Sequence, residues 1–117
     1  MANKITEEFG DLSLIDVMYA KPNEDSVFLE LISVGYVDGS PETQTNLLDK
    51  MEGYLKHIHS NEFKRDYPQS KIFIVVSFEV FPNKLITDLL YKCIPWCEEE
   101  GVVLKIRIGG EYVHFVD

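Results

Sequence analysis

Two strand-like runs near the start of the chain predict a β-hairpin. Residues 12–20 form a rough apolar run, residues 21–25 (KPNED) have the composition of a turn, and residues 26–34 are rich in β-branched and aromatic side chains. Runs of this kind on either side of a short Pro/Asn/Asp segment are typical of a hairpin. We expect residues 1–11, which are polar and acidic, to be a flexible N-terminus.

The next segment has the pattern of an amphipathic helix. Residues 40–42 supply a serine N-cap, a proline at the first helical position and an acid in the first turn. Hydrophobic residues then recur at helical spacing up to Ile58. The charged residues that fall on the other side of the wheel are Asp49, Lys50, Glu52 and Lys56. The pattern predicts a helix that ends near Ser60-Asn61.

The second half of the chain predicts a buried strand, a helix and a second hairpin. Residues 71–80 are almost continuously apolar, as in a central strand with both faces covered. The turn at residues 81–83 leads into a helix that Gly101 is placed to end. Residues 102–108 and 111–116 alternate in polarity on either side of two glycines, which predicts the closing hairpin.

This succession, ββαβαββ, predicts an α+β fold in one domain, residues 1–117. We expect a mostly antiparallel sheet with two helices packed on one face. A chain of 117 residues that is 45% hydrophobic is long enough to bury a single core.

Charge narrows the classes of partner. The chain has 20 acidic and 11 basic residues, a formal net charge of −9. Such a surface repels nucleic-acid phosphates and anionic lipids, and it speeds association with a basic protein, although acidic excess also serves solubility alone. No apolar run is long enough to cross a bilayer and the first residues do not resemble a signal peptide, so we expect no membrane binding and a cytoplasmic location.

The stretch YKCIPWCEEEG contains both cysteines of the chain. On a helical wheel Cys93 and Cys97 fall within the apolar stripe, which predicts inert core residues. A disulfide across one helical turn has poor geometry. A zinc site would need two further ligands, and His57 and His59 point to opposite sides of their helix. We therefore expect no metal and no cofactor.

The rest of this stretch is ambiguous. Trp96 lies at the edge of the apolar stripe, where it either covers the core or anchors a partner. Glu98, Glu99 and Glu100 crowd a helix C-terminus, which prefers cations, so they form either a solvated acidic end or a contact for a cationic partner. Pro95 predicts a kink or an early end of the helix.

Catalytic motifs are missing from the sequence. It contains no phosphate-binding glycine loop, nucleophile elbow or zinc-protease motif, so we expect no enzymatic activity. The three strand-associated carboxylates Asp16, Glu30 and Glu79 could form an acid–base pair if the sheet brought them together, or they could simply lie at edges or face solvent.

A combination of motifs resembles a small bacterial family that is known only as a domain of unknown function. The helix at residues 46–58 (NLLDKMEGYLKHI) fits its pattern L-L-x-K-x-x-x-Y-L-x-x-I, and Tyr67-Pro68 and the apolar strand from Ile72 follow. The resemblance covers residues 14–108. It implies a bacterial origin and a shared fold, and it supplies no activity or catalytic residue.

Two functions of different classes are compatible with these features. The first is a small acidic protein-binding module, most concretely an immunity or antitoxin-like protein that covers the basic active site of a toxin. Its candidate contacts are Asp38, Glu42, Trp96, Glu98, Glu99 and Glu100. The alternative is a small enzyme or ligand-binding protein with a cleft of carboxylates and histidines, lined by Asp16, Glu30 or His59.

Overall fold

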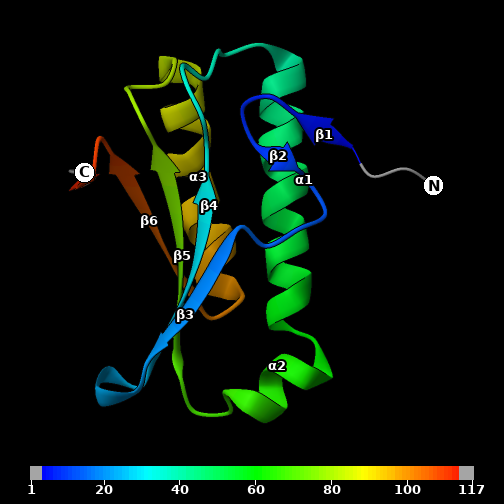
Figure 1. Ribbon diagram of the computed structural model, residues 1–117, viewed down its shortest axis with the longest axis vertical. Coiled ribbons are helices and arrows are strands. Elements are labelled where there is room, and N and C mark those ends of the chain that lie inside the picture. The colour runs from blue at the N-terminus through cyan, green and yellow to red at the C-terminus, as the bar shows by residue number, and fades with distance from the viewer. Residues whose placement is uncertain (1–3, 114–117) are drawn as a thin grey trace.

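A computed structural model describes residues 4–113, with one five-stranded sheet as its central element (Figure 1). The strands lie side by side in sequence order. They are β3 (Val17–Lys21), β4 (Ser26–Ile32), β5 (Lys71–Phe78), β6 (Val102–Ile108) and β7 (Glu111–Val113). Both predicted hairpins are present, and the predicted residues 114–116 of the last strand lie outside the described part of the chain.

The sheet is mixed, which corrects the prediction of a mostly antiparallel one. The outer pairs β3–β4 and β6–β7 are antiparallel, whereas β4–β5 and β5–β6 are parallel. Parallel neighbours arise because a helix follows β4 and another follows β5, and each returns the chain to the end where the preceding strand began. The α+β class, with helices packed against the sheet, is confirmed.

Three α-helices connect the strands, one more than predicted. They are α1 (Pro41–Ile58), α2 (Asn61–Asp66) and α3 (Lys84–Glu99), and a 3-10 turn η1 (Pro22–Glu24) lies in the first hairpin loop. The side chain of Ser40 caps α1 by accepting from Thr43 N, as the sequence predicts. Ser60, where we expected the chain to leave the helix, caps α2 by accepting from Phe63 N.

Pro95 does not end its helix, contrary to one of the two outcomes predicted for it. It is exposed, and α3 continues to Glu99. The last turn is held by Glu100 N, which donates to Cys97 O at 3.0 Å, and by Gly101 N, which donates to Glu98 O. Gly101 has a φ of 78°, a left-handed conformation that ends a helix at little cost for glycine.

Residues 4–11 contain two short strands and pack against the core. Residues 1–3 of the segment that we expect to be flexible lie outside the described part of the chain. Strands β1 (Ile5–Thr6) and β2 (Gly10–Asp11) form a small second sheet. Phe9, between them, is only 1% exposed and joins the main core. The segment looks polar in sequence because the buried Phe9 stands among polar neighbours.

A buried ion pair joins α1 to the chain just before β3. Lys50 is fully buried, although the helical pattern placed it on the polar side. Its Nζ lies 2.7 Å from Asp16 Oδ1 and also donates to Phe9 O. The Tyr54 hydroxyl, one turn further along α1, accepts from Asp16 N and donates to Glu30 O, both within 2.9 Å. The buried residues of α1 recur every three or four positions from Thr43 to Ile58, so Lys50 belongs to the one buried face of this helix.

Candidate functional site

The sequence-predicted contact residues lie at two opposite ends of the molecule. Both α1 and α3 begin where β4 and β5 finish, and both run back to the opposite end (Figure 1). Asp38 and Glu42 therefore lie at the strand end, where α1 begins. Trp96 and the three glutamates that follow it lie at the helix end, where α1 and α3 finish. The 18 residues of α1 span about 27 Å, so the six residues do not form one surface.

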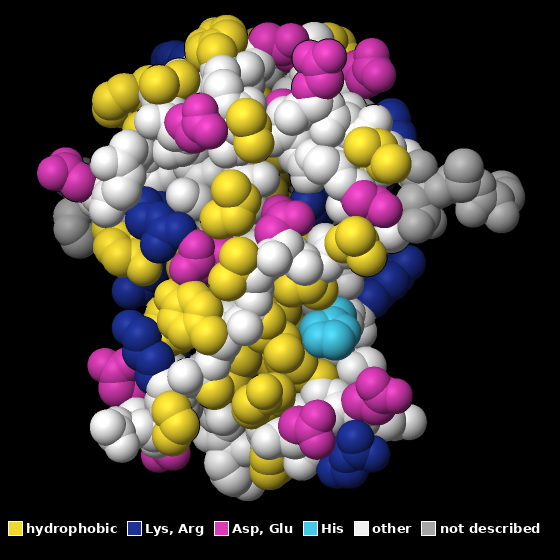
Figure 2. All heavy atoms as spheres, in the orientation of Figure 1, with side chains coloured by type: hydrophobic (Ala, Val, Ile, Leu, Met, Phe, Trp, Pro, Cys, Tyr) yellow, Lys and Arg dark blue, Asp and Glu magenta, His cyan; other side chains and the backbone are white. Residues whose placement is uncertain are grey.

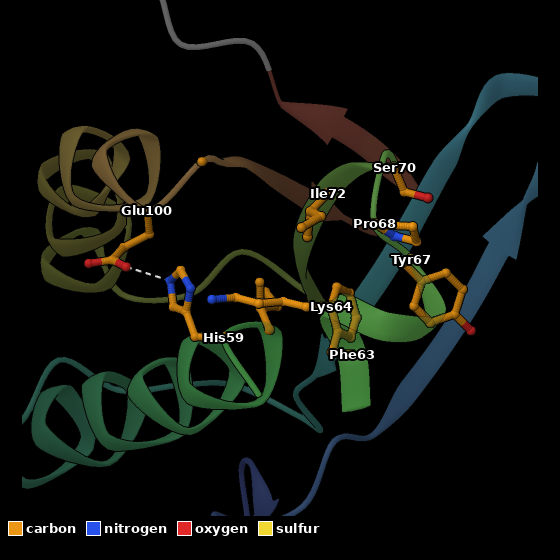
Figure 3. A pocket seen from close by; sticks show the side chains of 10 residues that line it. His59, Phe63, Lys64, Tyr67, Pro68, Ser70, Ile72 and Glu100 are labelled. Carbon is orange, nitrogen blue, oxygen red and sulfur yellow. Dashed lines mark hydrogen bonds and ion pairs between the residues drawn. The ribbon is translucent and has the colours of Figure 1, made fainter. Parts of the chain in front are cut away.

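One pocket of the helix end lies between α1, α2 and the end of α3. It encloses about 480 Å³, and its apolar wall includes Phe63, Tyr67 and Ile72. Figure 3 shows His59 reaching from the end of α1 toward Glu100, with Nε2 and Oε2 2.5 Å apart, and the Lys64 side chain beside them. The pocket is therefore an apolar hollow whose lining also includes three polar side chains, those of His59, Lys64 and Glu100.

A second hollow lies on the other side of the same His59–Glu100 pair. It encloses about 320 Å³, and Leu55, Lys56 and Trp96 contribute to its lining. Trp96 is half-buried and packs against the core, so it covers the core and borders a groove at once. His59 lies beside Glu100 at the negative end of α3, and Glu98 and Glu99 are exposed.

Large hydrophobic side chains are more exposed at the strand end than at the helix end. Two loops meet there, the β4–α1 loop (residues 33–40) and the β5–α3 loop (residues 79–83). Gly35 N donates to Glu79 Oε2 at 3.0 Å, and Asn83 N donates to Val37 O at 2.9 Å. Five side chains of these loops and the adjoining first turn of α3 are 50–75% exposed: Val34, Tyr36, Val80, Phe81 and Leu85. We call these five residues the strand-end surface.

An apolar pocket adjoins this surface. It encloses about 360 Å³ and shares Phe81 with the strand-end surface. Ile106, Ile108 and Val113 from the closing hairpin form its floor. The hollow can take one apolar side chain of a partner beside the exposed ring of Phe81.

Carboxylates surround the strand-end surface. Asp38, Glu42 and Glu79 are exposed on its two loops and at the start of α1, and Figure 2 shows Asp and Glu side chains next to hydrophobic ones across this end of the molecule. A hydrogen bond from the Thr43 hydroxyl, at 2.7 Å, and bonds from Ser40 hold the pKa of Asp38 below its usual value. Asp38 therefore stays ionised well below neutral pH.

The three strand-associated carboxylates do not form an acid–base pair. Asp16 reaches Lys50 on the helix side of the sheet. Glu30 pairs with Arg107 on the opposite side, and Glu79 accepts from Gly35 N. Each carboxylate therefore has a separate partner.

The two cysteines are core residues, as their place on the helical wheel predicts. Cys93 and Cys97 are free thiols and are 5% and 0% exposed. Burial raises the pKa of both, that of Cys97 to about 12, with smaller contributions from Cys93 and from Glu100 and Glu98. Among residues 4–113, no three His, Cys, Asp or Glu side chains come close enough to hold a metal ion.

These thiols predict a loss of stability at high pH. An unfolded cysteine ionises near pH 8.5, whereas folded Cys97 stays protonated up to a pKa of about 12. The unfolded state therefore binds fewer protons between these values, and the free energy of unfolding falls by up to about 1.4 kcal/mol per pH unit for this thiol. Urea unfolding of the wild type and of Cys97→Ala from pH 8 to 10.5 measures this effect. The free energy of unfolding of the variant should fall less steeply with pH, because the variant lacks the Cys97 thiol. Equal slopes would contradict the burial of Cys97.

Comparison with known proteins adds no relative. No family model, curated protein or solved structure matches the chain. The resemblance to a bacterial family of unknown function therefore stays a prediction. Over residues 4–113, no helix is both long and apolar enough to cross a membrane.

Sequence reasoning missed the strand-end surface. The sequence pattern predicts Val34 and Val80 as the last residues of strands and Phe81 as part of a turn. A signal was present, since Val34 and Tyr36 flank a glycine and Phe81 precedes a proline. Hydrophobic residues in loops that leave a strand have no strand neighbour to cover them, and this is the pattern that could have identified the surface.

Proposed function

We propose that the protein is a protein-binding module and that the strand-end surface is its contact site. The single observation that carries the proposal is the exposure of five large hydrophobic side chains on two loops that hydrogen bonds hold together. Single exposed hydrophobic residues are ordinary, but several of them on two neighbouring loops are typical of an interaction site.

The surface has the composition of a binding hot spot. Phe81 is 75% exposed and Tyr36 is 60% exposed, and aromatic residues carry much of the energy of protein interfaces. The Tyr36 hydroxyl accepts from Asn83 Nδ2 at 3.3 Å, which fixes the ring before any partner arrives. A rigid aromatic group loses little conformational entropy on binding.

The surrounding charge selects the kind of partner. Asp38, Glu42 and Glu79 give the surface an acidic rim, in a chain of net charge −9. A partner with an apolar centre and a Lys/Arg-rich rim fits this arrangement and gains association rate from it. An immunity or antitoxin-like role, with a basic toxin as the partner, is the most concrete form of this proposal.

A second candidate function is ligand binding in the helix-end pocket. The observation that favours it is the His59–Glu100 pair at the edge of an apolar hollow. This corresponds to the alternative of a histidine and carboxylate cleft. We rank it second because the pocket is open and its polar groups contact one another.

Affinity capture tests the protein-binding proposal. The wild type and a Phe81→Asp/Leu85→Asp variant are used as baits in a lysate of the producing organism, with Glu98→Gln/Glu99→Gln as a matched control at the helix end. We expect a basic protein that the wild type and the control capture and the strand-end variant does not. Capture of the same protein by all three, or its loss only with the control, would reject the proposed site.

A further inference from the structure

The face of the sheet that the helices leave uncovered differs in charge from the rest of the molecule. On this face Tyr19, Phe28 and Phe73 lie in register on β3, β4 and β5. Their rings stack with centroid distances of 5.2 and 4.7 Å. Lysines of β3, β5 and β6 surround this stack. Lys and Arg side chains gather along the left margin of Figure 2, on the side away from α1.

Aromatic rings hold the lysine side chains in place. Lys21 Nζ lies 4.7 Å from the centroid of Phe28. Lys105 Nζ lies 5.1 Å from the centroid of Phe73 and 5.2 Å from that of Tyr112, and Lys71 Nζ lies 6.0 Å from Phe73. Cation–π contacts of this kind restrict flexible lysines, so less entropy is lost when an anion binds them.

The positive charge of these lysines is only partly neutralised. Glu30 is paired with Arg107, and Glu24 lies 3.9 Å from Lys21. Among the described residues, Lys71 and Lys105 form no ion pair within 4.0 Å. Ammonium groups gathered on one face repel one another, which costs stability unless an anion lies between them.

A hollow of about 400 Å³ lies among these groups. Its lining includes Lys21, Lys71, Lys105, Phe28 and Tyr112. Glu24, which lies near Lys21, is the one carboxylate in this lining. Three lysines that border one hollow outnumber it and are suited to a phosphate group with several oxygen acceptors. The volume corresponds to a small molecule and not to an extended polymer.

We propose that the open face of the sheet binds a small phosphorylated ligand whose phosphates contact Lys21, Lys71 and Lys105. The site is separate from the strand-end surface and carries a different activity, the recognition of a small anion. Local positive charge attracts the ligand, while the net charge of −9 disfavours a long polyanion such as nucleic acid.

Titration of the ¹⁵N-labelled protein with ATP, without Mg²⁺, tests this proposal by amide NMR. We expect shifts confined to the strand residues that line this hollow and their neighbours. The same amides should respond to inorganic pyrophosphate, because the lysines contact phosphate. Raising NaCl from about 20 to about 200 mM should weaken binding several-fold. No shifts with either probe, a response to ATP alone, or tighter binding of a single-stranded oligonucleotide than of ATP would overturn the proposal.

Two substitutions of one type locate the site. Lys105→Gln and, separately, Lys71→Gln should each weaken ATP binding about tenfold, the equivalent of about 1.4 kcal/mol. Lys92→Gln, at an exposed lysine of α3 outside this face, should leave the affinity unchanged. Well-dispersed spectra show that each variant is folded. Equal affinities in all three variants would show that the open face is not the site.

Discussion

Asp16→Asn is expected to lower the free energy of unfolding by about 3 kcal/mol, because it leaves the charge of Lys50 buried without its partner. The Lys50 side chain is 0% exposed, and its Nζ lies 2.7 Å from Asp16 Oδ1. Asparagine has nearly the same shape as aspartate, so the substitution removes the charge and preserves the packing. Urea unfolding at pH 7 measures the loss.

Two controls separate the ion pair from other effects. Asp49→Asn removes an exposed charge from α1, the helix that carries Lys50. It should change the free energy of unfolding by less than about 0.5 kcal/mol. Asp16→Asn combined with Lys50→Met should be more stable than Asp16→Asn alone, since no buried charge then remains. If the single variant loses no more than Asp49→Asn does, the account of the buried pair is wrong.

Phe81→Asp is expected to weaken binding of the captured partner at least 100-fold, equivalent to about 2.7 kcal/mol. The substitution removes an aromatic anchor and places a carboxylate against the apolar centre of the interface. Because Phe81 is 75% exposed in the free protein, the thermal unfolding midpoint should change little. Titration calorimetry with the purified partner measures the affinity.

Leu14→Asp is the matched control for this prediction. Leu14 is also a large exposed hydrophobic residue, 56% exposed, but it lies before β3 and outside the strand-end surface. Its replacement should leave the affinity within about twofold of that of the wild type, since substitutions outside the contact surface are nearly neutral. Equal losses for Leu14→Asp and Phe81→Asp would indicate a general effect of added negative charge and not a contact at Phe81.

Local sequence patterns predicted the helices and strands better than they predicted which strands pair and in which direction. Caps, turn residues and periodicity identified both hairpins, α1 and α3, because these signals act within a few residues. The parallel pairing of β5 with both its neighbours depends on where two helices return the chain, and no short window contains this information. The helix α2 was missed because Ser60 ends one helix and caps the next.

Tertiary contacts decided the remaining differences. Lys50 looked like a surface residue because its acid, Asp16, lies 34 positions earlier in the chain. The six predicted contact residues share acidity or an aromatic ring, but the antiparallel course of helix and strand separates Asp38 and Glu42 from Trp96 and the glutamates beside it. Helical periodicity placed Cys97 in the core, whereas Phe81 lies in a loop, where no periodicity shows which side chains a neighbour covers.

The central claim is that the strand-end surface is where the protein meets a partner, and hydrogen exchange measured on the complex tests it most directly. With the partner bound, we predict slower amide exchange in residues 33–40 and 79–86, and unchanged exchange in residues 52–60 and 96–101. Slower exchange in the second pair of segments, with the first pair unchanged, would place the contact at the helix end and contradict the account.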